Sequence, residues 1–158
     1  MVFQKVEPKL AAKLRKNQTG KKLMFNIDTL KTFHQQSIVG HLGIEFLEAT
    51  DTYLTARMPV DQRTHQPFGI LHGGASVVLA ESLGSVASVL RIDVNTQRAV
   101  GLEVNANHIR SVSSGWVYGK CTPIHLGRTT HVWDIRITDE QERIVCVSRL
   151  TIAIIAAK

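Results

Sequence analysis

The sequence predicts an α+β fold in which a curved, largely antiparallel sheet wraps around one long helix. The first observation is the stretch 74–90, which contains no proline and no cluster of turn residues and suits a helix of about four to five turns. The second is a series of later segments in which apolar and polar residues alternate, as in half-buried strands. Because short turns link most of these segments, we expect antiparallel pairing, with the helix as the element that the sheet covers.

The composition indicates one globular domain preceded by a basic arm. Of the 158 residues, 44% are hydrophobic and 20% are charged, which is ordinary for a globular chain. The net charge of +6 comes from the first 24 residues, which contain seven Lys or Arg and one Glu, whereas the other 134 residues carry twelve basic and twelve acidic side chains. We therefore expect an arm at 1–26 outside a single neutral domain at 27–158.

The basic arm is expected to be solvated, because no aromatic residues are interleaved with its charges to stack on nucleic acid. An anionic partner or a membrane surface is the minor alternative. No stretch reaches the roughly 18 apolar residues of a membrane span, and the N-terminal residues lack the apolar core of a secretory signal. We expect a cytoplasmic protein that binds neither nucleic acid nor membrane.

The elements before and including the long helix follow in order. Asp28 is placed to cap a short helix over 28–39, and the alternation in 52–60 predicts a strand. A loop over 61–74 then leads into the long helix. Because almost no charge lies on any face of that helix, we expect it to be buried all round.

Four strands are predicted after the helix, over 98–111, 115–127, 128–139 and 143–155. Turn residues at 113–115 and 139–142 are typical of hairpin connections. In the first of these strands the apolar positions are expected to share one face, and they are Val100, Leu102, Val104 and Ala106. The polar positions expected on the opposite face are Glu103, Asn105 and Asn107.

Glu81 is the only carboxylate in the stretch 65–88, which is rich in small, apolar and hydroxyl side chains. No Lys or Arg stands three or four residues away on either side, where helix neighbours lie. Burying an unpaired charge is costly. Two interpretations stay open: partial burial keeps this carboxylate reactive, or it pairs with a loop cation elsewhere in the fold.

Gly73 and Gly74 are predicted to lie where the long helix starts. Backbone N–H groups there lack intrahelical partners, and glycine presents no side chain to block approach. The aligned peptide dipoles also make this end positive, so an oxyanion developing on an acyl carbonyl can bind there. The alternative is that the two glycines only permit close entry into the helix.

One chain cannot readily aim Gly73 and Glu81 at the same carbonyl. Eight residues of helix separate them by about 12 Å, and the free N–H groups point beyond the helix start. We therefore hypothesise a homodimer with shared sites, in which Glu81 of one subunit faces the helix start of the other across a two-fold axis.

Three further residues are weaker signals. His72 either orients the substrate or caps the helix, and the Gln66 amide either donates to a carbonyl or bonds to its own loop. Ser85 stands four residues after Glu81 and can donate to its carboxylate or to a helix carbonyl.

Several chemistries are excluded by the pattern of the sequence. The seven histidines form no HxH, HExxH or His-Cys cluster, and neither a GxSxG elbow nor a phosphate-binding P-loop is present. Cys121 and Cys146 stand in separate strand segments without CxxC spacing, so we expect buried hydrophobes. We expect no metal and no cofactor.

The stretches PFGILHGGASVVLAESLGSVAS, GLEVNANHIRS and PIHLGRTTHVWDI resemble the hotdog-fold acyl-CoA thioesterases of the phenylacetate-pathway and aryl-thioesterase type. The similarity runs from about residue 36 to 155 and is strongest to the subgroup that hydrolyses 1,4-dihydroxy-2-naphthoyl-CoA in menaquinone synthesis, with its paralogue that clears misloaded aryl carrier proteins. The resemblance implies the hotdog fold, a dimer with a continuous sheet, and commonly a tetramer.

The resemblance also implies roles for individual residues. Glu81 is implied to be the nucleophile or the general base for water, Gln66 and the Gly73 N–H to bind the thioester carbonyl, and His72 and Ser85 to line the site. The segments that match the coenzyme A contacts of the family are Gly101, then His108, Ile109, Arg110 and Ser111, and then His125, Leu126, Gly127, Arg128, Thr129 and Thr130.

The expected reaction is hydrolysis of an acyl-CoA thioester, with an aromatic acyl group favoured. Alternatives are a proofreading thioesterase acting on a misacylated carrier protein, a thioesterase for medium-chain acyl-CoA, or a non-catalytic acyl-CoA-binding module. A hydratase is not favoured, because no His-Asp pair stands at the expected junction of loop and helix.

Overall fold

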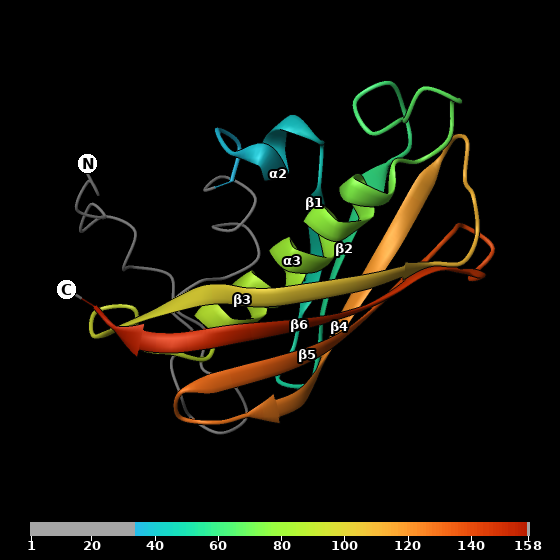
Figure 1. The fold of residues 1–158 in the computed structure, drawn as a ribbon. Helices are drawn as coiled ribbons and strands as arrows, with labels where there is room; N and C mark the ends of the chain where they lie inside the picture. The colour runs from blue at the N-terminus through green and yellow to red at the C-terminus, as the bar shows by residue number, and fades with distance from the viewer. Residues whose placement is uncertain (1–33, 158) are drawn as a thin grey trace.

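A computed structural model describes residues 34–157 of the chain. The elements are, in chain order, α2 (Ile38–His41), β1 (Glu45–Ala49), β2 (Leu54–Pro59), α3 (Gly73–Val89), β3 (Gln97–His108), β4 (Trp116–Leu126), β5 (Thr130–Thr138) and β6 (Ile144–Ala156). All six strands form one antiparallel sheet in the order β1-β2-β4-β5-β6-β3. The predicted α+β fold, with a sheet curved around a long helix, is confirmed (Figure 1).

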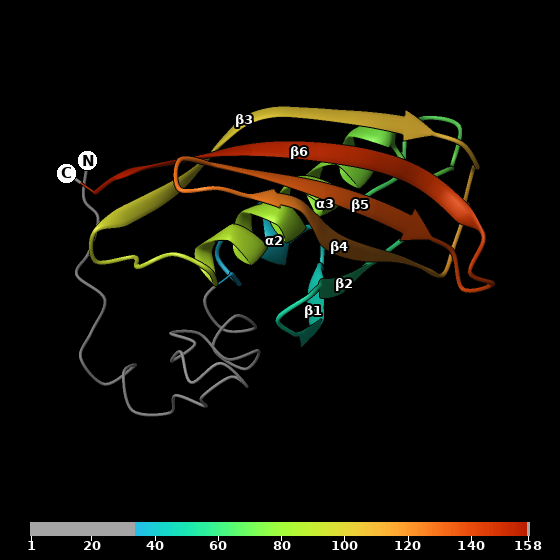
Figure 2. The same cartoon turned by 90° about the horizontal axis from the view of Figure 1, so that it is seen from below.

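The helix α3 lies in the hollow of the sheet (Figure 2). Its buried residues recur every three to four positions, as one face of a helix requires, and they are Ala75, Ser76, Leu79, Ala80, Leu83, Gly84, Val86, Ala87 and Ser88. Glycines allow the helix and sheet to approach closely: a Cβ on Gly84 would lie 2.4 Å from Leu150, and one on Gly119 would lie 2.5 Å from Leu83. Leu79 and Leu83 are fully buried, which stabilises the fold by about 1.5–3 kcal/mol for each side chain.

The expectation that α3 is buried all round is wrong for the single chain. Glu81 and Gly74 are exposed, and Val77, Val78 and Ser85 are only half-buried. One curved sheet covers only part of the circumference of a helix, so a stripe of α3 stays uncovered.

The N-terminal elements differ from the prediction. Of the expected helix over 28–39, residues 28–33 and the cap Asp28 lie outside the described residues, as does the boundary between arm and domain at 26/27. Residues 34–36 form a turn and the helix begins only at Ile38, because Ser37 accepts a hydrogen bond from the Val39 N–H and donates to the His34 carbonyl. The strand β1 was not predicted, since within it only Phe46 is fully buried and its alternation is short.

The turn at 139–142 joins β5 to β6 as a hairpin, as predicted. The turn at 113–115 does not: it connects β3, at one edge of the sheet, to β4, which pairs with β2 and β5. The strand β3 instead pairs with β6, which follows it by more than thirty residues. Pairing with a distant strand leaves no signal in the intervening turn.

A β-bulge changes the face pattern that we predicted for β3. Gly101 lies opposite Ile152 and Glu103 lies opposite Thr151, so Leu102 is an extra residue in β3. The expected shared face of Val100, Leu102, Val104 and Ala106 is therefore wrong in its first half. Val104 and Ala106 pack against the core, whereas Val100 is 44% exposed and Leu102 is 64% exposed.

Candidate active site

The Glu81 side chain projects from the uncovered stripe of α3. The residue is exposed, and within residues 34–157 no hydrogen bond or ion pair reaches its carboxylate. The predicted partial burial is therefore wrong for the single chain, and so is the alternative of an ion pair with a loop cation. A Cβ placed on Gly101 of β3 would lie 2.9 Å from the Glu81 Oε1, so the carboxylate rests against that glycine. Nothing in the described chain neutralises this charge.

The start of α3 leaves one backbone donor free. The His72 Nδ1 accepts a hydrogen bond of 2.8 Å from the Gly74 N–H, and the His72 carbonyl accepts from the N–H groups of Ala75 and Ser76. The Gly73 N–H has no acceptor among the described residues. Of the two glycines, Gly73 therefore carries the donor available to an oxyanion at the positive end of the helix.

The capping bond also fixes the chemistry of His72. Because Nδ1 accepts, the proton of the neutral imidazole is on Nε2, which is a donor on an exposed side chain. His72 thus caps the helix, as one of the two alternatives predicted, and it keeps a second donor near Gly73.

Gln66 is held by its own loop. Its Oε1 accepts a hydrogen bond from the Phe68 N–H, and its backbone exchanges further bonds with Ile70 and Gly69. Because the amide oxygen accepts from the Phe68 N–H, only the amide NH₂ remains as a donor, and it makes no hydrogen bond among the described residues. The loop bond that was the alternative to a catalytic role is therefore present.

The register of the sheet places the predicted coenzyme A segments 108–111 and 125–130 far apart along the direction of the strands. His108 of β3 lies opposite Cys146 of β6, and Thr130 of β5 lies opposite Ala153 of β6. These two positions on β6 are seven residues apart, a span of about 23 Å along the strand. The structure does not bring the two segments together within one chain.

The site residues divide into two groups by this register. The loop 64–72 is bonded to the backbone at Val112 and Ser113, so the first group gathers beside the start of α3 and the end of β3: Gln66, His72, Gly73, His108, Ile109, Arg110 and Ser111. The second group lies toward the start of β3 and the end of β6: Glu81, Ser85, Gly101, His125, Leu126, Gly127, Arg128, Thr129 and Thr130. The first group contains the predicted carbonyl donors and one coenzyme A segment. The second contains the predicted catalytic carboxylate and the other coenzyme A residues.

The part of the chain that contains most of these site residues matches a known protein family. Residues 68–146, which include the helix start, Glu81 and most of the sheet, match the thioesterase superfamily. The chain belongs to the thioesterase superfamily.

Relatives of this thioesterase support the assignment over most of its length. It is 52% identical over 134 residues to the 1,4-dihydroxy-2-naphthoyl-CoA hydrolase of Escherichia coli, covering 85% of this chain and 98% of that protein. It is 51% identical over 128 residues to the proofreading thioesterase EntH of Cronobacter turicensis, covering 81% and 93%. A crystal structure of a mutant thioesterase from Pseudomonas aeruginosa superposes with a TM-score of 0.83 at 53% identity, covering 84% of this chain and 96% of that one. The protein is a thioester hydrolase with a hotdog fold.

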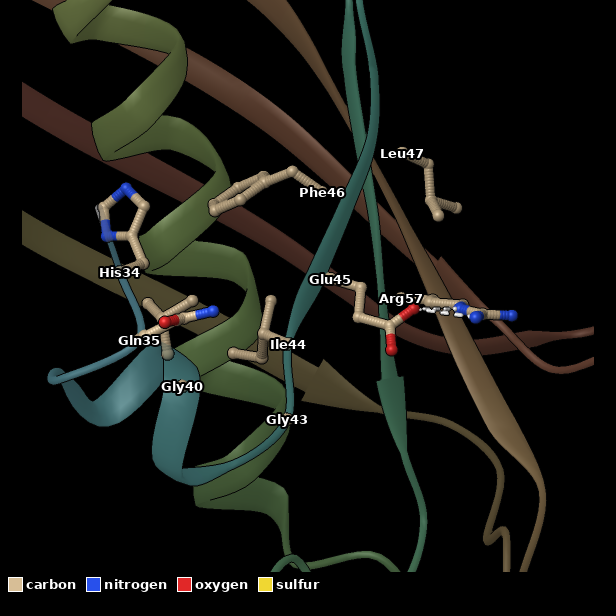
Figure 3. Close-up of a pocket in the computed structure, with 10 residues that line it drawn as sticks. His34, Gln35, Gly40, Gly43, Ile44, Glu45, Phe46, Leu47 and Arg57 are labelled. Carbon is tan, nitrogen blue, oxygen red and sulfur yellow. Dashed lines mark hydrogen bonds and ion pairs between the residues drawn. The ribbon is translucent and has the colours of Figure 1, made fainter. Parts of the chain in front are cut away.

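A pocket of about 510 Å³ in this thioesterase lies between α2 and β1, away from the two groups. The side chains of Ile44 and Phe46 point toward α3, whereas Glu45 and Arg57 form an ion pair of 2.7 Å on the other side of β1 (Figure 3). None of the predicted site residues lines this pocket. We place the candidate site at Glu81 and Gly73, because the pocket offers neither an unpaired carboxylate nor a free helix N-terminus.

Two residues have neighbours that the sequence did not indicate. A Cβ on Gly73 would lie 2.7 Å from the His108 Nε2, so the His108 ring sits over the helix start, and Gly101 sits beneath Glu81. From the sequence, both residues were expected only to contact coenzyme A. Contacts between α3 and the edge strand depend on the pairing of β3 with β6, for which no local sequence signal exists.

Neither cysteine of this thioesterase is suited to chemistry. Both are fully buried, as predicted, and burial raises the pKa of the Cys121 thiol to about 12. Among residues 34–157 no group of three or more His, Cys, Asp or Glu side chains is arranged to hold a metal ion. In the same part of the chain no helix is long and apolar enough to cross a membrane.

A buried polar cluster that the sequence analysis missed lies at the C-terminal end of α3. The Ser88 Oγ accepts a hydrogen bond of 2.8 Å from the Trp133 Nε1 and lies 3.2 Å from the His131 Nδ1. Since the Ser88 oxygen already accepts from Trp133, its hydrogen is free to point at His131. Burial, and then the nearby charge of Arg91, lower the pKa of His131, so the imidazole is neutral in the fold.

This cluster predicts a loss of stability in acid. The unfolded state binds a proton at His131 first as the pH falls, because its pKa is not lowered, so the free energy of unfolding decreases below about pH 6.5. We expect the melting temperature to fall more steeply between pH 7 and pH 5 in the wild type than in His131→Gln, as measured by thermal denaturation. Equal slopes for the two proteins would contradict the assignment.

Proposed function

We propose that the protein hydrolyses an acyl-CoA thioester to the free acid and coenzyme A, with an aromatic acyl group favoured. The observation that carries this proposal is the unpaired Glu81 carboxylate on an otherwise uncharged helix, in a chain of the thioesterase superfamily. The E. coli relative's name specifies 1,4-dihydroxy-2-naphthoyl-CoA, which is the first candidate substrate and would place the enzyme in menaquinone biosynthesis. A cytoplasmic location is part of the proposal, since coenzyme A thioesters are used there.

The residues of the two groups have complementary tasks. The Gln66 amide and the Gly73 N–H donate to the thioester carbonyl oxygen and stabilise the negative charge that develops on it. Glu81 attacks the carbonyl carbon to form an acyl anhydride that water then hydrolyses, or it takes a proton from the water that attacks the carbonyl. In both routes the C–S bond breaks, and the departing thiolate takes up a proton to give the thiol. His72 and Ser85 line the site. No cofactor is needed, because coenzyme A is part of the substrate.

A two-fold dimer completes the site. The edge of β3 that faces away from β6 has no partner strand in the described chain. Antiparallel pairing of two β3 edges about an axis near Val104 and Asn105 would bring Gly101 of one subunit beside His108 of the other, because these positions are equidistant from that axis. Glu81 of each chain then faces the other chain's Gly73. Pairing of two such dimers into a homotetramer is the larger assembly that we propose.

The same pairing of two subunits would bring the predicted coenzyme A segments close together. The residues 108–111 of one subunit and 125–130 of the other come to the same end of the joined sheet. Arg110 and Arg128 are exposed and can donate to phosphates, whereas the Gly127 N–H already donates to the Thr130 carbonyl and the His125 ring fills the space beside it.

A carrier-protein substrate is the second candidate, because the relative from Cronobacter turicensis is named a proofreading thioesterase. A medium-chain acyl-CoA is a third. The alternative of a non-catalytic binding module is set aside, since the relatives are thioesterases.

Steady-state kinetics across matched substrates test the proposal. We expect kcat/KM for aromatic acyl-CoAs to exceed that for aliphatic acyl-CoAs by at least about tenfold, since the substrate in the name of the E. coli relative carries an aromatic acyl group. A misacylated carrier protein measured in parallel serves as the competing substrate. A higher kcat/KM for the carrier protein would replace our first candidate by the second.

The role of Glu81 as nucleophile or general base is a separate question. An acyl anhydride trapped on Glu81, or oxygen from labelled water found in its carboxylate after a single turnover, would identify the nucleophilic route.

A further inference from the structure

We propose that the β-bulge at Gly101–Glu103 positions the Glu81 carboxylate, which rests directly against Gly101. This inference rests on the proposed function and adds a positioning residue to it. A Cβ on Gly101 would lie 2.9 Å from the Glu81 Oε1 and 3.9 Å from its Cδ, and within residues 34–157 no hydrogen bond or ion pair holds the carboxylate elsewhere. The absence of a side chain at Gly101 therefore determines where the carboxylate can rest.

The bulge determines which side chains of β3 face α3 before and after Gly101. Ala99 packs against the core and Gly101 faces Glu81, so the odd positions of β3 face α3 before the bulge. Val104 and Ala106 pack against the core, so the even positions face α3 after it. The extra residue Leu102 makes this switch.

The switch keeps a second carboxylate away from Glu81. In a regular strand that paired Leu102 without the bulge, Glu103 would lie two residues after Gly101 on the same face, toward α3. With the bulge, Glu103 turns to the other face, where its Oε1 accepts a hydrogen bond of 3.2 Å from the Asn105 Nδ2. A like charge beside Glu81 would favour its protonated form, which neither attacks a carbonyl nor accepts a proton. The bulge thus keeps the Glu81 carboxylate accessible and keeps the Glu103 carboxylate away from it.

Gly101→Ala separates positioning from folding. The new methyl group meets the far end of a flexible, exposed side chain, so the side chain can move at little cost to stability. We expect an unchanged melting temperature, a KM within about twofold of wild type, and a kcat lowered by about 10²-fold, because displacement of a reacting group by about 1 Å costs that much. Val100→Ala, whose side chain is on the other face of the same strand, is the matched control and keeps the wild-type kcat.

A double-mutant cycle with Glu81→Gln tests whether Gly101 acts through Glu81. If it does, Gly101→Ala lowers the residual kcat of the Glu81→Gln enzyme no further. An additive loss, a KM increase with kcat unchanged, or no change in either constant would overturn the positioning role. Substantial activity of Glu81→Gln alone would instead overturn the proposed function, so the two failures are distinguishable.

Discussion

Glu81→Gln is expected to lower kcat by about 10³-fold, the range associated with removal of an acid-base or nucleophilic group. The amide has nearly the same shape but neither attacks a carbonyl nor accepts a proton from water. Glu81 makes no hydrogen bond or ion pair within residues 34–157 and is exposed, so the substitution leaves no partner unsatisfied. We expect the melting temperature and the oligomeric state to stay the same, as measured by thermal denaturation and light scattering.

Glu140→Gln is the matched control for this prediction. Glu140 is an exposed carboxylate at the hairpin between β5 and β6, far along the chain from the site. The control is expected to keep the wild-type kcat. Equal activity of the two variants would show that a carboxylate at position 81 is not required, and the catalytic assignment would fall.

Two inactive chains are expected to restore activity to each other. One chain carries Glu81→Gln and the other carries Gln66→Ala with Gly73→Ala, which removes one carbonyl donor and crowds the other against the His108 ring. In a two-fold dimer with shared sites, each mixed dimer contains one site built entirely from intact residues and one that holds all the substitutions. Random association then gives about a quarter of the wild-type rate, since half of the dimers are mixed and half of their sites are intact.

Co-expression of the two chains with different affinity tags allows the mixed dimer to be purified and assayed. The parental homodimers, prepared in the same way, provide the background rate. A mixed dimer no more active than its parents would mean that each chain carries a complete site, and the placement of the two groups across a subunit boundary would be wrong.

Elements with local signals could be predicted from the sequence. The length of α3, its start at Gly73, the lone carboxylate of Glu81 and the alternation of the last three strands all follow from residues a few positions apart, and the structure agrees with them. The roles of the site residues came from resemblance to a family, and they stay predictions until the kinetics are measured.

Features that depend on pairing between distant strands became visible only in the three-dimensional fold. The partner of β3 is β6 and not its neighbour in sequence, the bulge at Leu102 turns Val100 outward, and the single chain leaves Glu81 exposed. These outcomes also place Gly101 under Glu81 and His108 over Gly73. Local periodicity indicates that a segment is a strand, but its neighbour and its register are set by packing between segments far apart in the chain, because only that packing determines which face is buried.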